Sequence, residues 1–125
     1  MALPAKLQND LKQFQRLQQE LQNASSQRLQ IDLKLRETGH TLEELKTLSE
    51  DAPIYRPIGG LLVRAKNRKE VEDILTEEKE TLEVRAKAIE RQENHLKERY
   101  TSMQRELSEA LQAAGVATQD AGAPG

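Results

Sequence analysis

Residues 54–65 read IYRPIGGLLVRA, an apolar stretch with two adjacent glycines near the centre of a chain that otherwise favours helix. Gly-Gly is an accepted two-residue hairpin turn, because glycine adopts the positive φ angles that such turns require. With the turn at Gly59 and Gly60, Ile58 lies opposite Leu61, and the two strands continue outward from this pair. The stretch therefore predicts a β-hairpin over residues 54–65, with an ordinary loop between two helices as the alternative.

The predicted hairpin has apolar side chains that the rest of the chain is not placed to cover, because the flanking helices leave from its base. A lone two-stranded hairpin is marginally stable in water, and exposed strand edges with apolar faces recruit other chains. We therefore expect an oligomerisation element that pairs with like hairpins into a closed sheet. Its expected contact residues are Ile54, Ile58, Leu61, Leu62 and Val63.

Pro57 makes the two edges of this hairpin different. Since Ile58 and Leu61 form the hydrogen-bonded pair beside the turn, position 57 points outward, where proline has no N–H to offer. Proline is thus compatible with the hairpin but weakens pairing along the outer edge of the first strand. The second strand, residues 61–65, keeps its outward donors and is the readier pairing strand.

The segment before the hairpin has the heptad spacing of a coiled-coil helix, which we predict over residues 4–49. Pro53 ends it, because the residue before proline avoids the α region. Gly39 costs roughly 1 kcal/mol in a helix interior, and Thr41 resembles a fresh N-cap, so a break there is an alternative. The heptad keeps its phase across Gly39, which favours one continuous helix. Position a holds Leu7, Phe14, Leu21, Arg28, Leu35 and Leu42, and position d holds Leu3, Asp10, Leu17, Ala24, Ile31, Thr38 and Leu45.

A second helix is predicted over residues 68–113. Asn67 caps it, with Glu70 at the spacing of a capping box, and Gly115 is a natural stop. The main seam positions are Leu75, Leu82, Ile89, Leu96, Met103 and Ala110, and the mostly polar companion positions are Val71, Glu78, Arg85, Gln92, Arg99 and Glu106. Residues 114–125 are small or polar, and we expect this tail to be disordered.

Folding the chain at the two glycines gives antiparallel arms of about 45 residues each, or roughly 65–70 Å. The predicted layers alternate between apolar pairs and pairs with a polar member. The apolar layers include Ala24 with Leu96 and Leu17 with Met103, and the mixed layers include Phe14 with Glu106 and Arg28 with Gln92. The last of these is either a register lock or a pair of side chains that reach water. The predicted fold class is mainly α, one coiled-coil and hairpin domain over residues 1–113, with the hairpin assembling into an intersubunit β-barrel.

Composition excludes several classes of protein. The chain has 125 residues, of which 36% are hydrophobic and 32% charged, so it lacks the thick core of a compact domain. Cysteine is absent, which removes disulfides and cysteine-based metal sites. A net charge of −2 argues against nucleic acid as the main partner. No apolar run suits a membrane span or a signal peptide, so we expect a soluble, cytoplasmic protein without a membrane partner.

No catalytic, cofactor-binding or metal-binding residue is predicted, and we do not expect an enzyme. His40 and His95 lie far apart, and neither has a second ligand at metal spacing. The carboxylates lack a pocket that would position a substrate. A basic cluster follows the hairpin, and it is either a solvated patch or a docking site. Its members are Arg64, Lys66, Arg68 and Lys69.

Four stretches together resemble a β-type subunit of the prefoldin family, over about residues 3–112. They are TLEELKTLSEDAPIY at 41–55, IYRPIGGLLVRA at 54–65, EEKETLEVR at 77–85 and ERQE at 90–93. A single hairpin fits the β type, since the α type carries two. The resemblance implies an ATP-independent chaperone of two α-type and four β-type subunits. It also implies a barrel of hairpins, from which coiled coils hang to hold unfolded polypeptides for a group II chaperonin.

Leucines gather where the two predicted arms end, at Leu3, Leu7, Leu11, Leu107 and Leu111. Asp10 and Ala110 replace large apolar seam residues nearby, so packing should weaken and leave these leucines available to clients. The alternative is that they only complete the coiled coil. Two functions therefore remain open: a chaperone subunit that holds unfolded chains, and a structural scaffold or tether without client binding.

Overall fold

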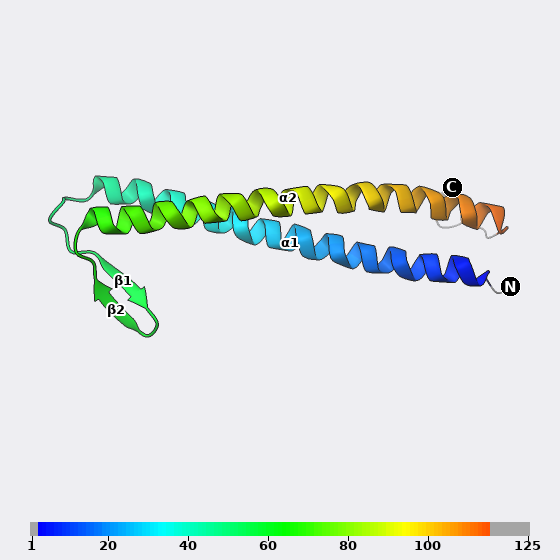
Figure 1. Ribbon diagram of the computed structural model, residues 1–125, viewed down its shortest axis with the longest axis horizontal. Coiled ribbons are helices and arrows are strands. Elements are labelled where there is room, and N and C mark those ends of the chain that lie inside the picture. Colours follow the sequence, from blue (N-terminus) through cyan, green and yellow to red (C-terminus); the bar gives the residue numbers. More distant parts are fainter. Residues whose placement is uncertain (1–2, 116–125) are drawn as a thin grey trace, which may run out of the picture. The chain divides into compact units, whose positions relative to one another are not determined.

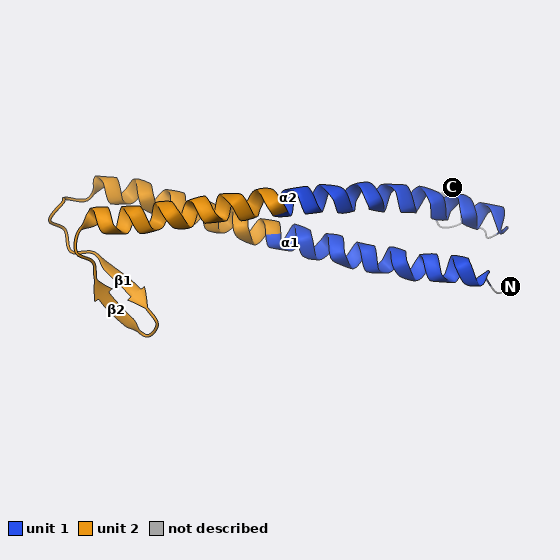
Figure 2. Ribbon diagram, viewed as in Figure 1, with its two compact units in different colours: residues 1–27, 89–125 blue, residues 28–88 orange. Residues whose placement is uncertain are grey.

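The computed structural model describes residues 3–115 and is mainly helical, as predicted (Figure 1). Its elements follow the order α1 (Ala5–Thr47), β1 (Tyr55–Ile58), β2 (Leu61–Arg64) and α2 (Arg68–Ala113). The chain divides into two compact units, residues 1–27 with 89–125 and residues 28–88 (Figure 2). The single domain expected over residues 1–113 stays a prediction. Most of the expected disordered tail, residues 116–125, lies outside the described residues.

The helix α1 runs without a break through Gly39, so the predicted continuity is confirmed. The hydroxyl of Thr41 donates to the carbonyl of Glu37 at 2.9 Å, and Thr38 donates to Lys34 at 2.8 Å. Thr41 therefore acts inside the helix and does not cap a new one. After Thr47 a short turn follows, with the Ala52 N–H donating to the Ser49 carbonyl at 3.0 Å.

The d positions of α1 form the buried stripe that the heptad predicts. All five from residue 17 onward are buried, whereas the a positions from Phe14 to Leu42 are only half-buried. The buried d residues are Leu17, Ala24, Ile31, Thr38 and Leu45.

The companion stripe predicted for α2 is wrong beyond Val71. The predicted positions Glu78, Arg85, Gln92, Arg99 and Glu106 are exposed, and so is the seam position Ala110. The line that is buried or half-buried instead holds Lys79, Ala86, Glu93, Tyr100 and Leu107. Each residue of the seam Leu75–Leu82–Ile89 has two neighbours on the same helix face, one three residues later in the chain and one four residues later. The predicted companion line consists of the first neighbours, and the observed line consists of the second neighbours. The second line buries more apolar surface here, which decides the orientation of the helix.

The unit formed by residues 1–27 and 89–125 has its own small core. Leu17, Ala24 and Leu96 are buried together, with Leu21, Tyr100 and Met103 packed against them. Phe14, which we predicted to face Glu106, instead stacks on Tyr100 with ring centroids 4.9 Å apart. The stacking follows from the corrected line of α2, because that line carries Tyr100.

The unit of residues 28–88 contains the hairpin and the adjoining parts of both helices, which lie side by side (Figure 2). Arg28 makes an ion pair with Asp32 at 3.5 Å, one turn along α1. Its predicted layer partner, Gln92, is exposed and not in the seam.

Among residues 3–115, no helix is long and apolar enough to cross a membrane.

Candidate interaction surfaces

The hairpin forms with the predicted register. Its pairs are Tyr55 with Arg64, Arg56 with Val63, Pro57 with Leu62, and Ile58 with Leu61. Gly59 has a φ of 59° and is the only one of the two turn glycines with a positive φ. A positive φ at the first central residue alone is the pattern of a type II′ turn, which is well matched to strand twist.

The hydrogen-bond phase of the hairpin agrees with the prediction made from Pro57. The Ala65 N–H donates to the Ile54 carbonyl at 2.9 Å, so these two residues form a bonded pair. Bonded and non-bonded pairs alternate in an antiparallel ladder, so Pro57 and Leu62 form a non-bonded pair whose backbone groups point outward. On its outer edge β2 presents the N–H groups of Leu62 and Arg64, whereas β1, at the opposite edge, has no N–H at Pro57.

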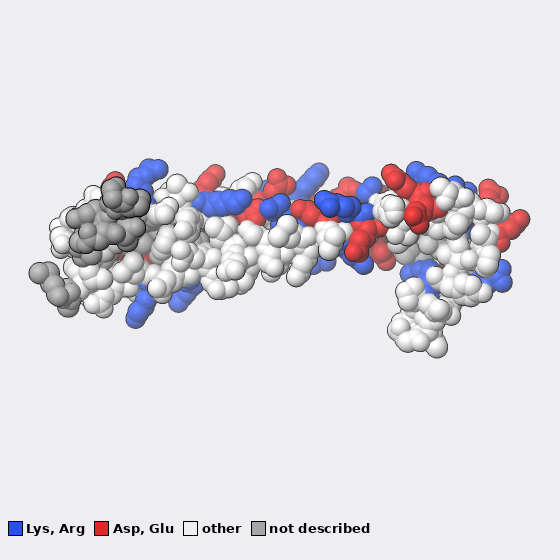
Figure 3. All heavy atoms as spheres, turned by 180° about the vertical axis from the view of Figure 1, so that it is seen from behind, with Lys and Arg blue, Asp and Glu red and all other residues white. Residues whose placement is uncertain are grey.

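The hairpin leaves large apolar side chains in water on both of its faces. Leu61 is 69% exposed and Leu62 is 73% exposed, and they lie on opposite faces. Tyr55, Ile58 and Val63 are exposed as well, whereas Ile54 is half-buried. Figure 3 shows the tip of the hairpin without charged side chains, with Lys and Arg only toward its base. An uncharged apolar surface on a strand pair is suited to bind other strands.

The hairpin is joined to α2 by a capped helix start. The Asn67 side-chain oxygen accepts the Glu70 N–H at 2.8 Å, which is the predicted N-cap. The Glu70 carboxylate in turn accepts the Lys66 N–H at 2.7 Å. These bonds fix the direction in which the chain leaves β2 and enters the helix.

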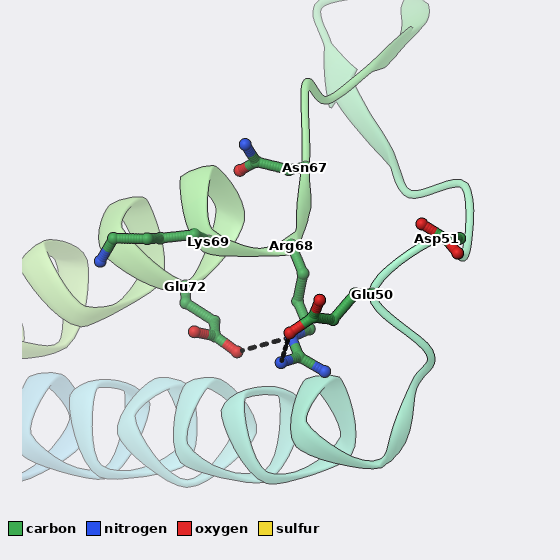
Figure 4. A pocket seen from close by; sticks show the side chains of 6 residues that line it. All are labelled: Glu50, Asp51, Asn67, Arg68, Lys69 and Glu72. Carbon is green, nitrogen blue, oxygen red and sulfur yellow. Dashed lines mark ion pairs between the residues drawn. The ribbon is translucent and has the colours of Figure 1, made fainter.

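Arg68 ties the start of α2 to the end of α1. Its guanidinium donates to the Leu48 carbonyl at 2.7 Å and makes ion pairs with Glu72 at 3.2 Å and Glu50 at 3.9 Å. Glu50 and Glu72 point toward this guanidinium from the loop and from α2, at a polar cavity of about 420 Å³ (Figure 4). A cation beside the last carbonyls of a helix is also favourable for the helix dipole.

The predicted basic cluster therefore divides into two pairs. Arg68 and Lys69 are engaged, since Lys69 makes an ion pair with Asp73 at 3.4 Å. Arg64 and Lys66 are exposed. We find no signal in the sequence that predicts the bond from Arg68 to Leu48, because it links residues 20 positions apart.

The five leucines expected at the ends of the arms fall into two groups. Leu7 and Leu107 are buried, while Leu3, Leu11 and Leu111 are half-buried. Leu11, Leu107 and Leu111 come together around an open, mainly apolar hollow of about 270 Å³, which we call the tip hollow. Its lining residues are Leu11, Phe14, Gln104, Leu107, Ser108 and Leu111.

Sequence reasoning missed Phe14 as a wall of the tip hollow. The signal was available, because Tyr100 follows Leu96 by four residues and so lies on the same helix face as the seam. The stacked Phe14 and Tyr100 rings, with the Gln18 amide donating to the Tyr100 hydroxyl at 3.5 Å, continue the packing beside the hollow.

The described part of the chain offers no arrangement for metal binding. Within residues 3–115, no group of three or more His, Cys, Asp or Glu side chains could hold a metal ion. His40 is exposed and lies 3.2 Å from the Glu44 carboxylate, and His95 is exposed.

Two long helices joined by an exposed central hairpin place this chain in the class of coiled-coil hairpin proteins, with candidate sites at the hairpin and at the tip hollow. Residues 8–114 match the family model described as Prefoldin subunit. The chain belongs to the prefoldin subunit family.

Curated relatives and a solved structure agree with this assignment. The chain is 41% identical to the prefoldin subunit beta of Archaeoglobus fulgidus over 109 residues, covering 87% of this chain and 93% of the relative. It is 38% identical to that of Thermoplasma acidophilum, covering 82% of each. The crystal structure of the prefoldin beta subunit from Thermococcus strain KS-1 matches with a TM-score of 0.77 and 34% identity, covering 88% of this chain and 96% of that one.

Proposed function

We propose that this chain is a β-type subunit of an oligomeric chaperone that holds nonnative polypeptides without ATP and passes them to a group II chaperonin. Membership of the prefoldin family implies a chaperone-type function. The proposal that the chain assembles with other subunits rests on the exposure of Leu61 and Leu62 on opposite faces of the hairpin. Covering one such side chain contributes about 1.5–3 kcal/mol, so a sheet of several hairpins gains considerable stability.

The proposed assembly is a closed sheet of hairpins from two α-type and four β-type subunits. Contact residues on this chain are Ile54, Ile58, Leu61, Leu62 and Val63. Closure would remove the exposed strand edges that make a lone hairpin prone to aggregation. The outward N–H groups of Leu62 and Arg64 make β2 the edge that we propose to pair first.

The proposed client site is the end of the helices, at Leu3, Leu7, Leu11, Leu107 and Leu111. Within this set, the half-buried Leu11 and Leu111 at the rim of the tip hollow are the side chains that a client would touch. Apolar segments of an unfolded chain would bind there by burial, at about 25 cal/mol per Å². Nonnative chains expose such segments during synthesis, which makes the cytoplasm the proposed location.

The experiment is an ATP-free aggregation assay with the assembled complex and a chemically denatured client. The variant Leu11→Gln/Leu111→Gln should suppress aggregation much less than the wild-type complex does. The matched control is Leu29→Gln/Leu33→Gln, which changes two leucines of α1 that are 63% and 56% exposed outside the tip hollow. Undiminished suppression by the first variant, in a complex of normal mass, would refute the client site.

A second candidate function is a structural scaffold or tether without client binding. The observation that favours it is the burial of Leu7 and Leu107, which leaves less apolar surface at the helix ends than the leucine count predicts. The same assay separates the two functions, because a scaffold would leave the client to aggregate even in the wild-type complex.

A further inference from the structure

The tip hollow combines apolar walls with a polar edge that carries no charge. All of its lining residues belong to the unit of residues 1–27 and 89–125. The apolar walls include the buried Leu107 and the aromatic ring of Phe14. The polar edge consists of Gln104 and Ser108, which are exposed and lie one turn apart on α2. An occupant of the hollow therefore meets hydrocarbon, one aromatic ring and neutral hydrogen-bonding groups, and no ionic side chain.

The volume of the hollow fits a single side chain with a ring. A closed apolar cavity of about 150 Å³ holds one benzene molecule. The tip hollow is open and measures about 270 Å³, so it accommodates a phenol or an indole ring while the backbone that carries the ring stays outside. A whole helix, about 10–12 Å across with its side chains, does not fit into this volume.

The aromatic wall favours a ring over an aliphatic side chain. Phe14 stacks on Tyr100 with ring centroids 4.9 Å apart, which holds the Phe14 ring in place beside the hollow. Aromatic pairs are stabilised beyond the burial of their surface, because the negative face of one ring attracts the positive edge of another. A leucine side chain in the same space buries apolar surface without this additional attraction.

The polar edge distinguishes among aromatic side chains. The Gln104 amide and the Ser108 hydroxyl each offer both a donor and an acceptor. Tyrosine and tryptophan carry one polar group on the ring, which needs a hydrogen-bond partner when the ring is buried. Phenylalanine has no such group. A charged side chain would lose its hydration and find no opposite charge in the lining, so the hollow selects against it.

We propose that the tip hollow binds the side chain of a tyrosine or tryptophan of a nonnative polypeptide, with the ring against Phe14 and its polar group at Gln104 or Ser108. This inference rests on the client site proposed above and names the side chains that the site selects. Folded proteins bury most of the surface of their tryptophans and much of that of their tyrosines. An accessible ring within an apolar segment is therefore a mark of a chain that has not folded.

The test titrates the full chain with an unstructured host peptide of glycine, serine and asparagine that carries one guest residue. The four guests are leucine, phenylalanine, tyrosine and tryptophan. Binding is followed by the methyl NMR signals of Leu107, the buried wall of the hollow, because the ring current of a bound aromatic guest shifts nearby methyl signals. The measurement needs neither a client protein nor a partner subunit.

We expect the phenylalanine peptide to bind about 2- to 12-fold more tightly than the leucine peptide, which is the attraction of an aromatic pair expressed as a ratio of dissociation constants. The tyrosine and tryptophan peptides should bind about threefold more tightly again, because their polar groups gain a hydrogen bond. Equal dissociation constants for the leucine and tyrosine peptides would overturn the proposal.

Two variants separate the ring from the polar edge. Phe14→Leu should remove the advantage of the aromatic guests over leucine. Gln104→Leu/Ser108→Ala changes only exposed side chains, and it should abolish the preference for tyrosine over phenylalanine while phenylalanine still binds. The matched control, Gln92→Leu/Ser102→Ala, makes the same two changes at exposed positions of α2 outside the hollow and should bind all four peptides like the wild type. An unchanged preference for tyrosine in Gln104→Leu/Ser108→Ala would refute the role of the polar edge.

The outcomes also separate this inference from the client site on which it rests. Equal binding of all four peptides at Leu107 would overturn the selection of a ring, while the hollow would remain a site for apolar segments. Unchanged Leu107 signals with every peptide would overturn both the selection and the client site.

Discussion

Apolar side chains are buried in the seam of the helices but exposed on the hairpin. In the seam, Leu17 is 3% exposed and packs into a core shared by α1 and α2. In the hairpin, Leu62 is 73% exposed although its backbone is fully in register with the other strand. Helices with a heptad stripe bury their leucines against each other, whereas a two-stranded sheet has two faces and covers neither. The seam therefore stabilises the chain itself, and we propose that the exposed hairpin binds other chains.

The largest expected effect comes from making the hairpin faces charged. We expect Leu61→Asp/Leu62→Asp to abolish assembly, because a carboxylate buried inside the closed sheet without a partner costs several kcal/mol. The mass of the complex by light scattering should fall, while the helix content by circular dichroism stays the same. Leu29→Asp/Leu33→Asp adds the same charge to exposed positions of α1 and should leave the mass unchanged. A normal mass for the hairpin variant would contradict the proposal that the exposed faces of the hairpin mediate assembly.

The next effect concerns the seam. Leu17→Ala should lower the free energy of unfolding by about 2–5 kcal/mol, because it deletes a buried side chain and leaves a cavity. Leu29→Ala, at a position 63% exposed on the same helix, should change it by less than about 0.5 kcal/mol. Thermal and urea unfolding followed by circular dichroism measures both. Equal losses in the two variants would mean that the buried stripe of α1 is misassigned.

A smaller effect is expected where the hairpin meets the helices. Arg68→Ala should cost about 1 kcal/mol, since the Arg68 side chain is 26% exposed and its ion pairs are partly screened. Amide exchange near Leu48 should also become faster, because that carbonyl loses its donor. Lys69→Ala is the control, as its ion pair is at a side chain 79% exposed. Equal effects of Arg68→Ala and Lys69→Ala in both measurements would mean that the bond from Arg68 to Leu48 contributes no stability.

The smallest effect is a gain. Gly39→Ala should stabilise the chain by about 0.5–1 kcal/mol, because glycine costs that much in a helix interior. A Cβ at this position would have no neighbour within 4 Å, so the new methyl meets no clash. A loss of stability would show that Gly39 has a role that the backbone of α1 does not reveal.

The sequence predicted those features that local rules determine. The hairpin register follows from Gly59, Gly60 and Pro57, which act within a few residues of one another. The buried stripe of α1 follows from its heptad, and the start of α2 follows from Asn67. Each of these depends on residues that are close together in the sequence.

The features that were not predicted from the sequence depend on contacts between side chains that are far apart in the chain. The leucine seam of α2 is compatible with two companion lines, and only the packing of Tyr100 and Leu107 against α1 selects one of them. Ala110, which belongs to the seam itself, is exposed as well. The bond from Arg68 to Leu48 likewise requires both helix ends to be in place. Leucines were predicted to gather at the ends of the arms, but the hollow that Leu11, Leu107 and Leu111 line together with Phe14 was not predicted.

The most direct test of the central claim, that the hairpin pairs with other chains through β2, is amide hydrogen exchange at Leu62 and Arg64. Their N–H groups point outward from the hairpin, so they have no strand partner within it. We predict fast exchange at these two amides in the single chain and strong protection in the assembled complex, with little change at Val63, whose N–H lies inside the ladder. Exchange at Leu62 and Arg64 that stays as fast in the complex as in the single chain would contradict the account.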